Sequence, residues 1–179
     1  QAQNAITVVG TAVTVSDSSA FGGICLQADQ SAGYVLTPVI PLADSYWTID
    51  FWINPNALPS PGSTSGCIQY GSGSSGNDGF CVALYNSGQI ACISTHGVEI
   101  NAGFASAGTR THVFIQRSGP TIYIGSGGSV GGSISISSTS FGAEKSFRIG
   151  YANTLYHDPK QIKIDEFRVF AGEAKYPLS

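Results

Sequence analysis

The feature that most constrains this chain is a succession of short β-type segments along almost its whole length. These segments are rich in Val, Ile, Thr and aromatic residues, and turns containing Gly, Ser or Asn separate most of them. No stretch of a dozen residues shows the helical period of apolar positions. Short strands at such regular spacing are typical of sandwiches, jelly rolls and barrels. The sequence therefore predicts an all-β fold, with a single domain over residues 1–179.

The segment Tyr46–Pro55 shows the strand pattern most clearly. Successive side chains of a strand point to opposite faces, so its residues divide into two sets. One face carries Trp47, Ile49, Phe51 and Ile53, and the other carries Tyr46, Thr48, Asp50, Trp52 and Asn54. We expect the apolar set to line the core.

Composition narrows the classes of partner. Only 11% of the residues are charged and the net charge is -3, with no basic stripe, so we predict that the protein does not bind nucleic acid. No apolar run approaches the length of a membrane span, so no membrane insertion is predicted. The sequence begins at Gln1 and has no methionine, which predicts a cleaved leader, another maturation cut or a trimmed start.

The cysteines leave two alternatives open. Cys25, Cys67, Cys81 and Cys92 could form two disulfides in any of three connectivities, or stay as buried free thiols. With a loop at Asn86–Gly88, the hairpin register places Cys81 opposite Ile93 and points the sulfurs of Cys81 and Cys92 to opposite faces. A four-residue loop would align them instead. We favour the free thiols, and the spacing fits no zinc pattern.

Two glycine-rich motifs match catalytic signatures only formally. Residues 71–76 (GSGSSG) fit the dinucleotide fingerprint, and residues 127–131 (GGSVG) fit a nucleophile elbow. Both signatures require a helix directly after the motif, and the sequence predicts strands there. We therefore interpret both as loops.

Carboxylate placement argues against glycoside hydrolysis, which needs two acids flanking one sugar bond. Asp165 and Glu166 are adjacent, so a regular strand sends them to opposite faces. Asp50 has no second acid on its own face of the strand. His112 precedes the apolar run Val113–Ile115, which favours a structural histidine. We therefore predict no catalytic residues.

Six stretches, in this order and spacing, resemble the laminin G-like, concanavalin A-like jelly-roll superfamily, in the version frequent in phage virion proteins. The stretches are SSAFGGICLQAD (18–29), YWTIDFWINPNAL (46–58), GFCVALYNSGQIACI (79–93), TRTHVFIQRSGPTIYI (109–124), FRIGYA (147–152) and IDEFRVFAGEAKY (164–176). The resemblance implies an antiparallel β-sandwich of jelly-roll type.

The resemblance also implies that residues 164–176 include a closing strand. Its acidic pair is then structural, with Asp165 or Glu166 pairing with an arginine or capping a turn, and with Phe167 and Val169 facing the core. Arg110 departs from the family, which often has tryptophan at this position. Many calcium-binding members have an acidic cluster at one rim, which this sequence lacks. We therefore predict no metal site and no cofactor, and calcium stays an unsupported alternative.

These observations predict a non-enzymatic protein on the virion surface, as a capsid decoration protein or part of a tail fibre. Its partners would be other virion proteins, copies of itself or cell-surface glycans. The alternative is a secreted, extracellular lectin-like adhesion module, and a β-sandwich glycoside hydrolase comes third. The first strand could pair across subunits or close its own sandwich. Candidate ligand-binding residues in two loops are Asn77, Asp78, Asn153, Tyr156, His157 and Asp158.

Overall fold

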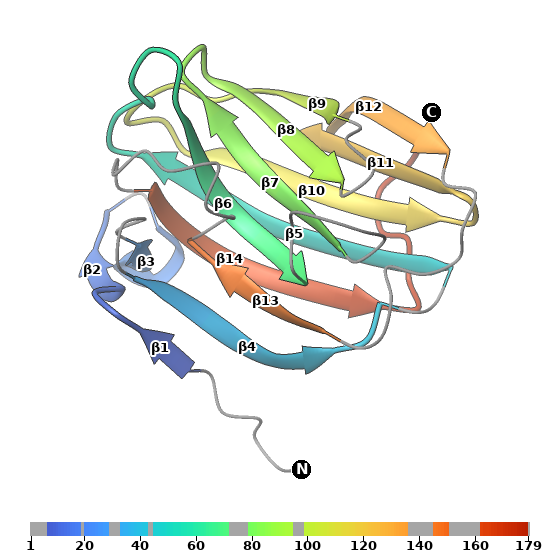
Figure 1. The fold of residues 1–179 in the computed structure, drawn as a ribbon, viewed down its shortest axis with the longest axis horizontal. Helices are drawn as coiled ribbons and strands as arrows, with labels where there is room; N and C mark the ends of the chain where they lie inside the picture. The colour runs from blue at the N-terminus through green and yellow to red at the C-terminus, as the bar shows by residue number, and fades with distance from the viewer. Residues whose placement is uncertain are drawn as a thin grey trace.

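Two antiparallel sheets of seven strands each pack face to face in the computed structural model of the chain (Figure 1). The structure describes residues 7–18, 20–28, 33–42, 45–71, 79–94, 99–135, 145–150 and 162–178. Within these ranges the one helical element is the short 3-10 turn η1 (Phe21–Gly23). The predicted antiparallel β-sandwich is confirmed.

The strand order of each sheet follows from the pairing of its strands. The first sheet has the order β1 (Thr7–Val9), β4 (Tyr34–Ile40), β13 (Lys145–Ile149), β6 (Thr64–Gly71), β7 (Gly79–Tyr85), β8 (Gln89–Ser94), β9 (Glu99–Phe104). The second sheet has the order β12 (Ser129–Ser135), β11 (Thr121–Ser126), β10 (Thr111–Ser118), β5 (Tyr46–Pro55), β14 (Ile162–Ala171), β3 (Ile24–Ala28), β2 (Val13–Ser16).

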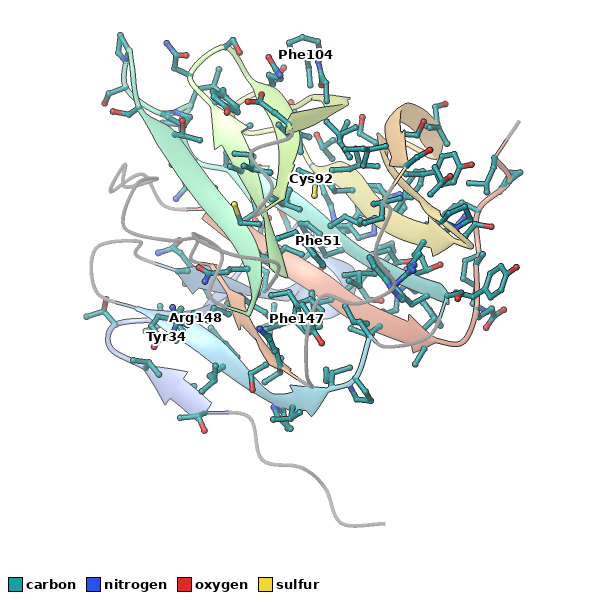
Figure 2. All side chains as sticks on the ribbon, turned by 45° about the vertical axis from the view of Figure 1, so that its right-hand side comes forward. Tyr34, Phe51, Cys92, Phe104, Phe147 and Arg148 are labelled. Carbon is teal, nitrogen blue, oxygen red and sulfur yellow. The ribbon has the colours of Figure 1, made fainter. Side chains whose placement is uncertain are left out.

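The core lies between the sheets and follows the alternation of β5. The side chains of Trp47, Ile49, Phe51 and Ile53 are fully buried, which confirms the predicted core face. Figure 2 shows Phe51 of β5 and Phe147 of β13 between the two sheets, and both belong to the core cluster. Burial of apolar area at about 25 cal/mol per Å² is the main force that holds such a sandwich together.

The hairpin between β7 and β8 has the predicted loop and register. Gly88 adopts a φ of 86°, which favours glycine, and Cys81 lies opposite Ile93. All four cysteines are free and buried, as the preferred alternative predicted. Burial raises the pKa of the thiols of Cys67 and Cys81 to about 12.

The N-terminal segment divides between the two sheets. It is interrupted at Gly10, whose φ is 66°, so β1 joins the first sheet and β2 joins the second. β1 pairs with β4 and β2 pairs with β3, both within the chain. The N-terminal segment therefore adds one edge strand to each sheet of its own sandwich, and pairing of these edges across subunits stays a prediction.

The two lateral ends of the sandwich differ. At one end, the edge strand β12 approaches β9 so closely that a Cβ on Gly131 would lie 2.4 Å from the carbonyl oxygen of Ala102. The Ser126 hydroxyl also donates a 3.0 Å hydrogen bond to this oxygen. At the other end, the described residues leave an opening between the edge strands β1 and β2, lined by apolar side chains of both sheets.

Candidate functional site

The predicted ligand loops contain Asn77, Asp78, Asn153, Tyr156, His157 and Asp158, all of which lie outside the described residues. Within the described part, polar and aromatic side chains gather on the outer face of the second sheet, the face that points away from the core. They come from β5, β10 and β14, from η1 and from the C-terminal tail 172–178. These residues form two neighbouring clusters.

The first cluster, which we call the tail cluster, forms where the C-terminal tail crosses β5 and β10. The Tyr176 hydroxyl donates a 2.7 Å hydrogen bond to the Asp50 carboxylate and lies 3.1 Å from Nε2 of His112. Its ring stacks on Phe114, with the centroids 4.3 Å apart. Arg168 of β14 completes the cluster, with its Nε 2.7 Å from Asp50. Tyr176 therefore covers the Asp50 carboxylate on the outer face of the sheet.

Side chains of the sheet also bind the backbone of the tail. The amide of Gln116 accepts a 2.7 Å hydrogen bond from the Tyr176 N–H and donates a 2.9 Å bond to the Tyr176 carbonyl. The Thr48 hydroxyl accepts from the Lys175 N–H and donates to the Glu173 carbonyl. Thr48, Asp50 and Gln116 point away from the core, yet all three are buried. Their outward direction could be predicted from β5 and β10, but their burial depends on the tail.

His112 has the structural role that the sequence predicted. Its ring contacts Trp52, with centroids 5.1 Å apart, and Tyr176, with centroids 5.5 Å apart. Burial lowers its pKa below the ordinary value of 6.5, and this effect outweighs the opposing field of Asp50. The neutral imidazole is therefore the form that the fold favours.

The second cluster, the arginine cluster, is built around Arg110. The guanidinium carbon lies 4.0 Å from the ring centroid of Phe21 and 4.5 Å from that of Trp52. Its Nη2 is 2.7 Å from the Asp165 carboxylate, which also accepts a 2.8 Å hydrogen bond from the Phe21 N–H. A planar guanidinium that packs against two rings gains cation–π attraction as well as its ion pair. Arg110 thus fixes η1 against the sheet.

The acidic pair of β14 does not alternate as predicted. The register shifts between Asp165 and Arg168, and Glu166 has a φ of 53° at this bulge. Asp165 binds Arg110, and the Glu166 carboxylate lies 3.7 Å from Arg168. The prediction that the two acids lie on opposite faces is therefore wrong, because the extra bulge residue interrupts the period of two. The predicted arginine partner of the pair is confirmed.

After the bulge, β14 returns its apolar side chains to the core. Phe167 and Val169 are partly buried and pack against the core cluster, as the resemblance implied.

The acidic side chains of the described part take part in ion pairs or hydrogen bonds. Every acidic side chain in the described part has a partner: Asp17 with Lys163, Asp50 with Arg168, Glu99 with Tyr85, Asp165 with Arg110, Glu166 with Arg168, and Glu173 with Lys175. A glycosidase needs two carboxylates that can reach one sugar bond, and carboxylates held by partners are less free to do so. These residues are therefore poorly suited to glycoside hydrolysis.

The hollow beside the arginine cluster is too small for a sugar. Its volume is about 10 Å³, and its lining includes Asp17, Asn54 and Arg110. This is room for roughly one water molecule.

Among the described residues, no group of three or more His, Cys, Asp or Glu side chains could hold a metal ion. No helix in the same part of the chain is long and apolar enough to cross a membrane.

These features define a β-sandwich with the concanavalin A-like fold. The model of the concanavalin A-like lectin/glucanases superfamily matches residues 29–174, and the chain belongs to this superfamily. No curated protein sequence matches the chain.

Solved structures share the fold at low sequence identity. The receptor binding domain of botulinum neurotoxin C/D mosaic serotype has a TM-score of 0.71 at 13% identity, over 96% of this chain and 44% of that one. The binding domain of Paraclostridial Mosquitocidal Protein 1 has a TM-score of 0.72 at 14% identity, over 96% of this chain and 45% of that one. The chain therefore spans less than half the length of these structures.

Proposed function

We propose that this domain is a non-enzymatic recognition module of a virion surface, either a capsid decoration protein or part of a tail fibre. It would act through contacts with other virion proteins, with copies of itself or with cell-surface glycans, and without a cofactor. The observation that carries the non-enzymatic part is the pairing of every described acidic side chain. On the outer face, Asp50 is held by Arg168 and Tyr176, and Asp165 is held by Arg110.

Two further observations support a role in binding other molecules. The neighbouring structures are named as the receptor binding domain of a botulinum neurotoxin and the binding domain of a mosquitocidal protein, so the same fold presents binding surfaces in those proteins. The chain is also weakly charged, with 11% charged residues, which suits close packing against another protein better than steering of charged ligands. The virion location rests on the resemblance of residues 164–176 to virion proteins.

The test of the virion role is mass spectrometry of purified intact particles. We expect the chain at a fixed stoichiometry relative to the capsid or tail proteins. Its absence from particles, together with a monomeric state at high concentration in sedimentation experiments, would refute the virion role.

A secreted lectin-like module is the second candidate, and the arginine cluster favours it. Phe21 is 56% exposed beside Trp52, and Asn54 and Asp17 line the small hollow next to Trp52. An aromatic face next to amide and carboxylate oxygens can bind a sugar ring at the surface. A glycan array with Phe21→Ala tests this site, with Phe104→Ala as the control, because Phe104 on β9 is similarly exposed at 64% (Figure 2). Equal glycan binding by both variants would exclude the arginine cluster.

A further inference from the structure

The open lateral end of the sandwich forms a groove that the proposed function does not use. The groove lies between the sheets and has a volume of about 400 Å³. This volume falls in the range of about 300–1,000 Å³ that is common for small-molecule sites. The opposite end of the sandwich is closed by the glycines of β12.

The groove is lined mainly by aliphatic side chains of both sheets. Its lining comprises Val8, Ala12, Val13, Thr14, Ile24, Cys25, Leu26, Val35, Ile149, Ile164, Asp165, Glu166 and Phe167. Several of these apolar side chains are open to solvent: Ile24 is 58% exposed and Val8 is 59% exposed. A contiguous exposed apolar surface of this kind marks a binding site more often than a plain surface does.

The charged groups of the groove have one sign. Among the described residues, Asp165 and Glu166 are the only charged ones that line it, and no described Lys, Arg or His does. Asp165 is neutralised by Arg110 at 2.7 Å and also accepts from two backbone N–H groups. Glu166 has a weaker partner: Arg168 is 3.7 Å away, and the Nε of Arg168 lies 2.7 Å from Asp50. A ligand cation would therefore meet an incompletely compensated carboxylate at Glu166.

The backbone at Glu166 supports a role beyond packing. Among the described residues, Glu166 is the one non-glycine residue with a positive φ, at 53°. This conformation costs roughly 1 kcal/mol or more for a residue with a Cβ, and such strain gathers at functional sites. The bulge that produces it brings the Glu166 side chain into the lining of the groove.

We propose that this groove binds a small amphiphile with an aliphatic body and one cationic group, an alkylammonium in its simplest form. The aliphatic chain lies between β1 and β3, against Leu26, Val35 and Ile164. The ammonium group pairs with the Glu166 carboxylate. The aliphatic part of the site lies between the sheets, while Asp165 is shared with the arginine cluster and Glu166 contacts Arg168 of the tail cluster. Its test uses small amphiphiles instead of particles or glycans, so its failure is distinguishable from failure of the proposed function.

Three probes with the same aliphatic chain test the charge preference: octylammonium, 1-octanol and octanoate. Calorimetric titration of the protein should give the tightest binding for octylammonium, about fivefold tighter than octanol, as expected for one partly exposed ion pair. Octanoate should bind most weakly. Glu166→Gln should remove the preference for octylammonium over octanol and keep octanol binding. Glu173→Gln, which removes an exposed carboxylate of the tail, should change neither.

A second variant tests the location. Thr14 lies on the exposed edge strand β2 and lines the groove, so Thr14→Trp should fill its mouth and abolish binding of all three probes. Val130→Trp on β12 makes a similar change at the closed end and should leave binding intact. Equal affinity for octylammonium and octanol, or an unchanged preference in Glu166→Gln, would overturn the proposal. It would equally be overturned if none of the probes bound, including where sedimentation shows a second copy covering the groove.

Discussion

Removal of the Tyr176 hydroxyl is the sharpest test of the tail cluster. In Tyr176→Phe the ring still stacks on Phe114, while Asp50 loses a 2.7 Å hydrogen bond and His112 loses its 3.1 Å contact. A hydrogen bond to a charged group contributes about 1.5–3 kcal/mol, so we expect unfolding to become easier by about 2 kcal/mol. For a chain of this length, that loss lowers the melting temperature by roughly 4–8 °C.

Urea denaturation followed by fluorescence measures this change, with Tyr46→Phe as the control. Tyr46 is 50% exposed, and its hydroxyl should contribute less than about 0.5 kcal/mol. A double-mutant cycle with Asp50→Asn should show coupling, because both changes remove the same bond. The reasoning would be refuted if Tyr176→Phe were as stable as Tyr46→Phe, or if its effect added independently to that of Asp50→Asn.

The stability of the protein at alkaline pH is a second measure of the hydrogen bond between Tyr176 and Asp50. Burial, and then the hydrogen bond to Asp50, raise the pKa of Tyr176 above its ordinary value of 10.0. The folded state therefore holds this proton more tightly than the unfolded state. The resulting stability is present below pH 10.0 and decreases as the pH rises above it. In Tyr176→Phe this part of the alkaline loss should be absent.

Three other outcomes are expected. Because burial lowers the pKa of His112, its contribution to stability is present above pH 6.5 and falls as the pH drops below that value. Urea titrations across this range should show a smaller acid loss in His112→Gln, and an identical loss would contradict the burial argument. Gly131→Ala should destabilise the protein by about 1–3 kcal/mol, because its Cβ meets the Ala102 carbonyl. An unchanged melting temperature would mean that β9 and β12 lie farther apart. With pKa values of about 12, the thiols of Cys67 and Cys81 should resist a thiol reagent until urea unfolds the chain. Rapid labelling of the native protein, located by peptide mass spectrometry, would show that they are accessible.

Local patterns predicted much of the fold. The alternation in Tyr46–Pro55 identifies its buried face, because the period of two is a property of the strand itself. The register of the hairpin that pairs Cys81 with Ile93 follows from the loop at Asn86–Gly88. Both predictions concern residues close together in the chain, where the backbone geometry is sufficient.

Contacts between distant segments could not be predicted in the same way. The burial of Thr48 and Asp50 depends on the C-terminal tail. The tail residues that bind them, Glu173 and Tyr176, are 125 and 126 positions away in the sequence. The bulge at Glu166, by contrast, does shift the apolar period, because Ile164 and Phe167 both face the core and are three positions apart, whereas a regular strand separates such residues by an even number. The predicted ligand loops lie outside the described residues, so that hypothesis stays a prediction.

The positions of β13 and β14 inside the two sheets determine when the native fold can form during biosynthesis. In the first sheet, β13 lies between β4 and β6; in the second sheet, β14 lies between β5 and β3. A nascent chain that ends before residue 145 therefore holds two interrupted half-sheets, whose unpaired edges only the later residues can join. Neither sheet can be completed while the ribosome still retains these strands, so the native topology of this domain forms only after β13 and β14 have emerged.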